Sequence, residues 1–446
     1  MDLNPSRRTG PKLRAASGGL FLASIFYGDI WLGITVPVSM LLLPFVFLAY
    51  ANTHPLARIP AGFWLLLGMS LPVAMQFALG RPLNGKSDAV VYLPIAYALA
   101  TMFVLRRAEL RTDTIWRAFV GGGCVAAGTM VLMMLFVPVT TFLVPGQNYS
   151  ATQRNYQVAA GQKARDQRNI PAVSGGGASA DSMPVPNAAL SEAELGLQVS
   201  QFERGFYGFK RSVRNGLGQS NYIAAFFVFF FTVSLFHSRW TAATVFALLA
   251  IATLSRFGVI FLSLTFALWI LHRRGARPIA LATGTLALGL TTMVGLLAVV
   301  EGMKVPTSVA IRGAYWRKAV TVISAHPLVG APRSHILETF DLNILWNPHN
   351  VLLWVSALVG VIGMVFYAAF LFVALREIHQ RATTSLLWAG IFFGFIVMLT
   401  WSLFEPIALT PAFELLLAAL YTLARNDRVA VPVPEGAAGE PVLAHS

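Results

Sequence analysis

Cysteine, charge and above all negative charge are scarce in this 446-residue chain. A single cysteine, Cys124, cannot form an internal disulfide, so a fold held together by disulfides is excluded. Charged residues make up 12% of the chain, against about 25% in soluble domains, which argues against a soluble enzyme, a disordered tail or a coiled coil. Only 19 acidic residues accompany 33 basic ones, for a net charge of +14. These scarcities leave a polytopic membrane protein whose segments outside the bilayer are basic.

What the chain has in abundance is hydrophobic residues, which make up 56% of it and gather in runs long enough to span a bilayer. Two runs, 17–50 and 240–271, are too long for one helix; interruptions at Gly28-Asp29 and Ser255-Arg256 predict two spans in each. The other predicted spans are 60–80, 88–105, 118–145, 219–236, 278–300, 350–374, 383–404 and 407–424. The predicted fold class is therefore an all-α polytopic membrane protein with about twelve transmembrane helices.

The distribution of Lys and Arg predicts the side on which each loop lies. With the N-terminus in the cytoplasm, every short cytoplasmic loop carries at least one arginine, and both ends of the chain are cytoplasmic. The polar, basic segment 1–16 does not have the pattern of a secretory signal peptide. The predicted order is transmembrane helices 1–5 in 1–145, a large external loop in 146–218, helices 6–9 in 219–300, a second external loop in 301–349, helices 10–12 in 350–424, and a cytoplasmic tail in 425–446.

The densest cluster of external charge closes the first large loop, in the sequence RGFYGFKRSVRNGLGQSNY at 204–222. Lys210, Arg211 and Arg214 alternate there with aromatic residues, and the segment 188–214 predicts an amphipathic helix. One interpretation is a belt of side chains on lipid headgroups. The other is an anion site for a phosphate-bearing substrate, since the planar guanidinium binds phosphate oxygens in pairs. Nucleic acid is disfavoured, because the segment enters the membrane on its external side.

Two further arginines occupy positions that need an explanation. Arg256 lies in TLSRFG, between two apolar helices, where an unsolvated cation is costly. Arg312 and Trp316 lie one turn apart on the same face of a predicted amphipathic helix, with Arg317 and Lys318 on another side. Arg256 and Arg312 could each simply be a residue at the membrane surface, and this is one interpretation. The alternative is that these cations face a polar cavity, with Arg312 near the same pocket as Arg214.

His349 marks the junction between the second external loop and the next span, in NPHNVLLWVSALVGVIG. Pro348 suits a helix start, and Asn347 or Asn350 is placed to cap it. A lone histidine at an interface also fits a packing or hydrogen-bonding residue. With several arginines expected on the same membrane face, it becomes a candidate general base, since its side chain accepts a proton near neutral pH.

Motifs for metal or nucleotide binding are missing from the sequence. There is no Asp-x-Asp pair, no HExxH and no P-loop, and the spacing of His335, Glu338 and His349 is not that of a metal motif. We therefore expect no metal and no cofactor. Arginine side chains must then stabilise any negative charge that develops during a reaction.

In their order along the chain, four segments carry a family resemblance: RNGLGQSNYIAAF, then TLSR, then an R-x-x-x-W helix followed by HPLVG, and finally PHNVLLWVSALVGVIG. Over roughly residues 204–424 the sequence resembles the O-antigen ligase/polymerase family of bacterial envelope glycosyltransferases. The resemblance implies a GT-C-like architecture in the bacterial inner membrane, with an active site facing the periplasm. It also implies transfer of a glycan from an undecaprenyl-pyrophosphate carrier to an acceptor hydroxyl, without nucleic acid.

The resemblance assigns roles to individual residues. His349, Arg214 and Arg312 fall on the catalytic positions. The family's arginine of the TLSR turn falls on Arg256, and Arg211 is the alternative to Arg214. The residues expected to bind the pyrophosphate are Arg211 and Arg256 together with their neighbours in these segments, Lys210, Trp316 and Arg317. The sequence departs from the family pattern at two places. It reads Gly330-Ala331-Pro332 where the family often has a Gly-x-Gly run, which affects the expected local backbone. It also lacks the family's second histidine before the PHN position, which affects the assignment to the ligase subfamily.

Three functions are compatible with the sequence alone. O-antigen ligation, with lipid A–core as acceptor, is the first choice. A polymerase that joins lipid-linked repeat units is the close alternative. A transporter of lipid-linked sugars is the third. A transporter predicts charged residues deep within the spans, but the predicted spans are nearly free of charge, and Glu414 is the main exception.

Overall fold

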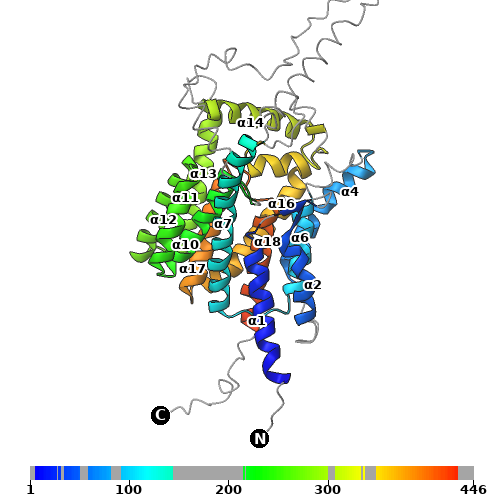
Figure 1. Ribbon diagram of the computed structural model, residues 1–446. Coiled ribbons are helices and arrows are strands. Elements are labelled where there is room, and N and C mark those ends of the chain that lie inside the picture. The colour runs from blue at the N-terminus through cyan, green and yellow to red at the C-terminus, as the bar shows by residue number, and fades with distance from the viewer. Residues whose placement is uncertain are drawn as a thin grey trace, which may run out of the picture. The chain divides into compact units, whose positions relative to one another are not determined.

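Helices form nearly all of the secondary structure in the computed structural model (Figure 1). The structure describes residues 6–27, 29–31, 35–50, 59–81, 92–143, 214–215, 217–299, 307–332, 335–336 and 348–429. The chain divides into two compact units: the first holds Met1–Thr129 and Asn215–Ser446, and the second holds Met130–Arg214. The predicted amphipathic helix at 188–214 lies outside the described residues, except for the backbone of Arg214.

The N-terminal part of the first unit contains one long helix and several short ones. Its elements are α1 (Ser6–Ser24), β1 (Asp29–Trp31), β2 (Thr35–Pro37), α2 (Val38–Tyr50), α3 (Ala61–Gly68), α4 (Ser70–Ala78), α6 (Leu93–Leu105) and α7 (Thr112–Leu143), whose last part belongs to the second unit. The predicted interruption of 17–50 is present, because α1 ends at Ser24 and the antiparallel β1–β2 pair begins at Asp29. Helix α1 begins at Ser6, so it includes most of the polar, basic segment 1–16.

The C-terminal part follows the apolar runs closely. Its elements are β3 (Arg214–Asn215), β4 (Gly218–Gln219), α10 (Ser220–Phe236), α11 (Trp240–Ala252), α12 (Arg256–Arg273), α13 (Pro278–Val299), α14 (Thr307–Ala325), α16 (Val351–Ala382), α17 (Leu386–Trp401) and α18 (Pro411–Val429). The predicted break in 240–271 is present, with α12 starting at Arg256. Helix α16 continues eight residues beyond the predicted end of its span at 374.

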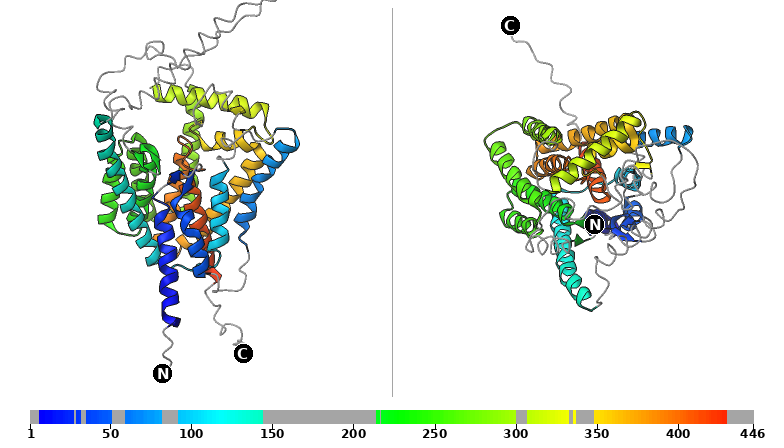
Figure 2. Two further views of the ribbon diagram at one scale, coloured as in Figure 1. Left: turned by 45° about the vertical axis from the view of Figure 1, so that its right-hand side comes forward. Right: turned by 90° about the horizontal axis from the view of Figure 1, so that it is seen from above.

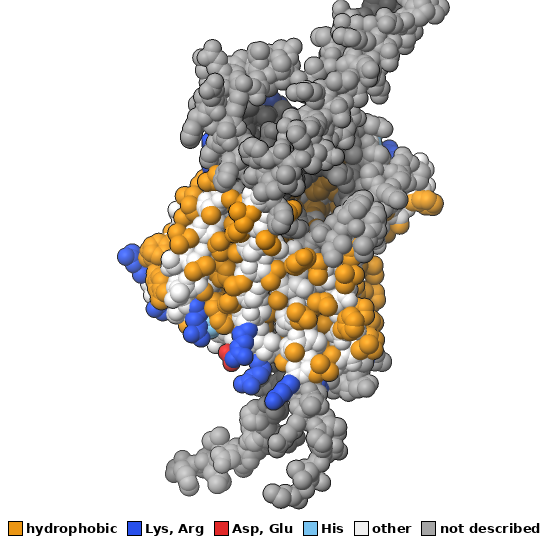
Figure 3. Space-filling model, viewed as in Figure 1, with side chains coloured by type: hydrophobic (Ala, Val, Ile, Leu, Met, Phe, Trp, Pro, Cys, Tyr) orange, Lys and Arg blue, Asp and Glu red, His pale blue; other side chains and the backbone are white. Residues whose placement is uncertain are grey.

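Several helices are long and apolar enough to cross a bilayer. Within the described residues these are Ala61–Ala78, Thr112–Leu135, Arg256–Arg273, Pro278–Ala298 and Val351–Ala382, and five shorter apolar helices accompany them. A band of exposed hydrophobic side chains covers the visible face, and Lys and Arg side chains gather along its lower edge (Figure 3). An exposed apolar surface of this extent requires a lipid environment, so the chain is a multi-pass membrane protein.

The core lies where α10 and α17 pack together. Almost every residue of both helices is buried, as expected for helices that are apolar on all sides. Aromatic rings join them: Phe229 meets Phe395 with ring centroids 5.3 Å apart, and Phe236 stacks on Phe393 at 4.7 Å. The pair therefore forms a rigid support for the segments attached to its ends.

Opposite ends of the helices differ in character. At one end, Asn426 of α18 donates to the carbonyls of Leu105 and Ala108, and Arg381 donates to that of Ala424, which brings the ends of α6, α16 and α18 together. Arg106, Arg107, Arg111, Arg117, Arg239, Arg273, Arg274 and Arg277 flank helix ends that we predict to be cytoplasmic. At the opposite end, α14 (yellow in Figure 2) lies across the helix axes (Figures 1 and 2).

Two glycines let the segment that follows α14 cross α16 backbone to backbone. Gly330 (φ 71) and Gly360 (φ 62) both have positive φ, and a Cβ on either would collide with the other segment's backbone, at Leu358 and Leu328 respectively. Ala331 donates to the carbonyl of Ala357 at 2.8 Å across the same crossing. The crossing interrupts α16 at Gly360 and fixes α14 against its N-terminal half.

We predict that Gly360→Ala lowers the thermal stability of the purified protein clearly. The backbone of Gly360 (φ 62, ψ −168) lies in a region that is open almost only to glycine and costs other residues about 1–3 kcal/mol. The collision of an added Cβ with the backbone of Leu328 increases this cost. Gly128→Ala in α7 is the matched control, because nothing lies within 4 Å of its added Cβ, so its melting temperature should stay or rise. Equal melting temperatures for Gly360→Ala and wild type would disprove the crossing.

Candidate active site

The carboxylate of Glu405 is the centre of a buried polar cluster in the turn between α17 and α18. Glu405 is 4% exposed. Its Oε1 lies 3.1 Å from Nδ1 of His349, and its Oε2 accepts from Arg312 at 2.9 Å and from the amide of Asn221 at 3.3 Å. Four segments that are distant in sequence therefore meet at one side chain.

The turn that carries Glu405 is fixed by its own hydrogen bonds. Helix α17 ends at Trp401, and the turn follows from Ser402. Pro406 disfavours helical geometry at Glu405, the residue that precedes it. The hydroxyl of Ser402 accepts from the backbone N–H of Ala408 at 3.0 Å, and the carbonyl of Ser402 accepts from Val351 at 2.8 Å. The second of these bonds ties the turn directly to the start of α16, which lies two residues after His349.

His349 is held in an uncommon backbone conformation. Its φ is 50°, in the left-handed region that costs a non-glycine residue about 1–3 kcal/mol and often marks functional sites. Asn350 maintains this conformation: its Oδ1 caps α16 by accepting from Leu353, and its Nδ2 donates to the carbonyl of Leu403 at 2.7 Å. Of the two predicted capping residues, Asn350 is thus the cap, while Asn347 lies outside the described residues.

Arg312 reaches the cluster from α14. Its side chain is 18% exposed, and its guanidinium also lies over the ring of Phe257, 5.2 Å from the centroid. One turn further along α14, Trp316 is buried against Met293 and Phe404. The predicted shared face of Arg312 and Trp316 is present, and it anchors α14 so that the guanidinium points at Glu405.

The turn between α11 and α12 joins the cluster through Ser255. Its hydroxyl donates to Oδ1 of Asn221 at 2.9 Å and accepts from the N–H of Gly258, which makes it the N-cap of α12. Leu254 before it has a φ of 54°, a second strained position beside the cluster. Asn221 is therefore oriented by Ser255 so that its amide donates to Glu405.

The charges around Glu405 determine its protonation. Burial by itself raises the pKa of this carboxyl, but the hydrogen bond and charge of His349, together with those of Arg312, outweigh burial and hold its pKa below the usual value. An ionised carboxylate only accepts hydrogen bonds, so Nδ1 of His349 must carry the proton. The nitrogen that exchanges a proton is then Nε2, on the opposite edge of the ring, as a general base needs.

The other predicted site residues are placed differently. Arg256 begins α12 with an exposed side chain, next to Ser255, and Arg317 is exposed on α14. Trp316 is 2% exposed, so in this conformation it packs the core and offers little surface to a ligand. Lys210 and Arg211 lie outside the described residues, and of Arg214 only the backbone in β3 is described. Among the described residues, no group of three metal-binding side chains is found.

Glu405 and Asn221 are the members of the cluster that the sequence patterns did not single out. Glu405 stands in the sequence Phe404-Glu405-Pro406, between two apolar runs on the predicted external side. An acid in so short a connection, on the same predicted membrane face as His349 and Arg312, is a sequence signal that can identify Glu405 as their partner. Asn221 lies in the SNY segment at the start of α10, beside a group of basic residues with a more conspicuous pattern.

Acidification should reveal the contribution of Glu405 to stability. Because its folded pKa is lowered, its stabilising effect is present above 4.5, its usual value, and is lost as the pH falls through the lower folded pKa. We predict that Glu405→Gln is less stable than wild type by about 3 kcal/mol at neutral pH, and that the gap narrows below pH 4.5. Thermal unfolding at a series of pH values from 7 downward measures this stability difference. Glu109→Gln, which changes an exposed acid, is the control. A gap that does not change with pH contradicts the assignment.

Comparison with known proteins does not add to this geometry. No protein-family model matches the chain, and no curated protein matches it. The resemblance to the O-antigen ligase/polymerase family thus rests on the four ordered segments, and the function is a proposal built on them and on the Glu405 cluster.

Proposed function

We propose that this protein is a glycosyltransferase of the bacterial inner membrane that transfers a glycan from an undecaprenyl-pyrophosphate carrier to an acceptor hydroxyl at the periplasmic face. The observation that carries the proposal is the pairing of both oxygens of Glu405, one with Nδ1 of His349 and the other with Arg312. A base and a cation are thereby held side by side at one end of the helices. That combination suits a reaction that removes a proton and releases an anion.

His349 is the proposed general base. With its Nδ1–H directed at Glu405, its Nε2 takes the proton from the acceptor hydroxyl. The side chain is 19% exposed, which leaves room for contact with a substrate. Glu405 is a positioning residue: it fixes the tautomer and stabilises the imidazolium that forms, as an acid does in hydrolase triads. A well-placed base of this kind contributes roughly 10²–10⁴-fold to the rate.

The acceptor oxygen then bonds to the anomeric carbon of the donor, and the bond from that carbon to the pyrophosphate oxygen breaks. Undecaprenyl pyrophosphate leaves with the bonding electrons, and attack from the opposite side inverts the anomeric centre. Arg312 stabilises the charge that develops on the leaving group, since Glu405 occupies only one of its five N–H donors. The sequence patterns assign Arg214, Arg211, Lys210 and Arg256 to pyrophosphate binding as well.

The proposed architecture has about twelve transmembrane helices, a GT-C-like arrangement and two large periplasmic loops. Helix α10 supports this orientation, because it runs from Asn221 in the Glu405 cluster to the turn at Arg239. The cluster thus lies at the helix end opposite the arginine-rich end, which the distribution of basic residues assigns to the cytoplasm.

Lipid A–core is the proposed acceptor, with a second lipid-linked repeat unit as the alternative that makes the enzyme a polymerase. The transporter alternative gains little from Glu414. This acid accepts from the hydroxyl of Tyr367 and from the backbone N–H of Leu409. It is fully buried, so its described contacts join α16 to the start of α18 rather than line a pathway.

We predict that His349→Ala lowers glycan transfer by about 10²–10⁴-fold in a reaction of purified protein with lipid-linked glycan, acceptor and EDTA. His326→Gln is the matched control: it changes another histidine of the second large loop, and its side-chain oxygen can still accept from Arg81, the partner of His326. Its rate should remain near that of wild type.

The same reaction separates the alternatives. Transfer to lipid A–core identifies a ligase, and elongation of the lipid-linked glycan without lipid A–core identifies a polymerase. A near-normal rate for His349→Ala, or a need for divalent metal, contradicts the proposed mechanism. Translocation of the lipid-linked glycan in liposomes without any transfer would favour the transporter.

A further inference from the structure

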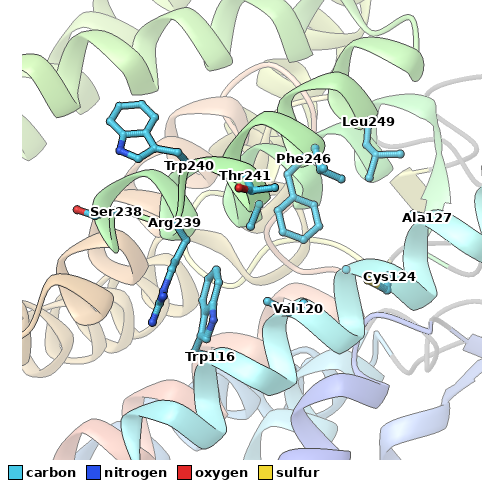
Figure 4. Close-up of a pocket in the computed structure, with 13 residues that line it drawn as sticks. Trp116, Val120, Cys124, Ala127, Ser238, Arg239, Trp240, Thr241, Phe246 and Leu249 are labelled. Carbon is cyan, nitrogen blue, oxygen red and sulfur yellow. The ribbon is translucent and has the colours of Figure 1, made fainter.

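A groove of about 720 Å³ lies between α7 and α11, far from the Glu405 cluster (Figure 4). One wall comes from α7 and the other from the turn between α10 and α11 and from α11 itself. The lining residues that carry its character are Trp116, Val120, Cys124, Arg239, Trp240 and Leu249. Its volume is within the range of small-molecule and cofactor sites, which is about 300–1,000 Å³.

Polarity in this groove changes from one end to the other. Arg239 and Ser238 lie in the turn at one end, where the side chains of Trp116 and Arg239 lie beside each other (Figure 4). Toward the other end the lining is apolar, with Val120, Cys124 and Leu249. Arg239 is the one charged residue among the 13 that line the groove, and no acid is among them.

The groove opens on a surface with exposed apolar side chains. Trp240, at its polar end, is 53% exposed, and Val245 along its wall is 48% exposed. Tryptophan is enriched at the level of the lipid headgroups, so Trp116 and Trp240 mark the position of the membrane interface. The apolar part of the groove then lies at the depth of the acyl chains, and Arg239 at the depth of the phosphates.

We propose that this groove binds one anionic phospholipid of the leaflet at the arginine-rich end. The phosphate contacts Arg239, and one acyl chain lies along Val120, Cys124 and Leu249. Charge complementarity selects an anionic lipid, because the only charge in the lining is positive, and basic pockets between helices at the cytoplasmic side are known to bind anionic headgroups.

This lipid site is separate from the proposed glycan-transfer site. Helix α10 has 17 residues and is about 25 Å long at 1.5 Å per residue. Asn221, at its beginning, belongs to the Glu405 cluster, and Arg239 follows its end by three residues. The two sites therefore lie toward opposite membrane faces, and the lipid proposal does not depend on the enzymatic one.

Cys124 provides a direct reporter for occupancy. It is the only cysteine of the chain, it is exposed, and it lines the apolar part of the groove. The rate of its alkylation by N-ethylmaleimide is followed by intact mass on the full chain in detergent. Palmitoyl-oleoyl-phosphatidylglycerol is titrated in one series and palmitoyl-oleoyl-phosphatidylcholine in the other, so that the acyl chains are identical and only the headgroup charge differs.

We expect phosphatidylglycerol to slow alkylation at lower concentrations than phosphatidylcholine. Arg239→Gln should remove that preference, raising the phosphatidylglycerol concentration for half protection by about fivefold, as expected for one arginine near the surface. Arg273→Gln, which changes an arginine at the same end of the helices that does not line the groove, should keep the preference. Both variants alter charges near helix ends, and their melting temperatures verify that they are folded.

Two results would overturn the proposal. Equal effects of the two lipids on wild-type alkylation, including no effect of either, mean that the groove has no anionic-lipid site. A preference for phosphatidylglycerol that persists in Arg239→Gln means that the headgroup is recognised elsewhere.

Discussion

A buried carboxylate that must find partners is the constraint on which the functional end of this protein depends. An unpaired charge at this depth is strongly destabilising, and loss of one partner of a buried pair costs about 3–5 kcal/mol. Glu405 meets the requirement with His349, Arg312 and Asn221, which come from three other segments of the chain. The need to neutralise one acid therefore brings the start of α16, helix α14 and the start of α10 into one place.

Hydrophobic runs and capping residues allowed much of this fold to be predicted. The break before Arg256 and the cap at Asn350 follow from local chemistry, since a polar interruption ends an apolar run and a capping side chain needs only the next turn. Glu405 was missed because its role depends on residues 56 and 93 positions away in sequence. The crossing at Gly330 and Gly360 was missed for the same reason, because each glycine is required by the backbone of a distant segment, at Leu358 and Leu328 respectively.

The structure also separates two roles of basic residues that the sequence presents together. Arg312 is bound to a carboxylate at one end of the helices, whereas Arg239 lines a groove between α7 and α11 at the other. The net charge of +14 therefore includes an arginine that pairs with the acid beside the candidate base and an arginine that lines a separate groove. Helix α10 connects the two ends, because Asn221 lies at its beginning and Arg239 follows its end by three residues.

The central claim, that Glu405 acts through His349, is tested most directly by a double-mutant cycle on the rate of glycan transfer. The rates of wild type, His349→Ala, Glu405→Gln and the double variant are compared, because residues that act as a unit are strongly non-additive. We predict that Glu405→Gln slows the wild type but changes the rate of His349→Ala very little. Equal fold-losses from Glu405→Gln in both backgrounds would show that the two side chains act independently and would contradict the claim.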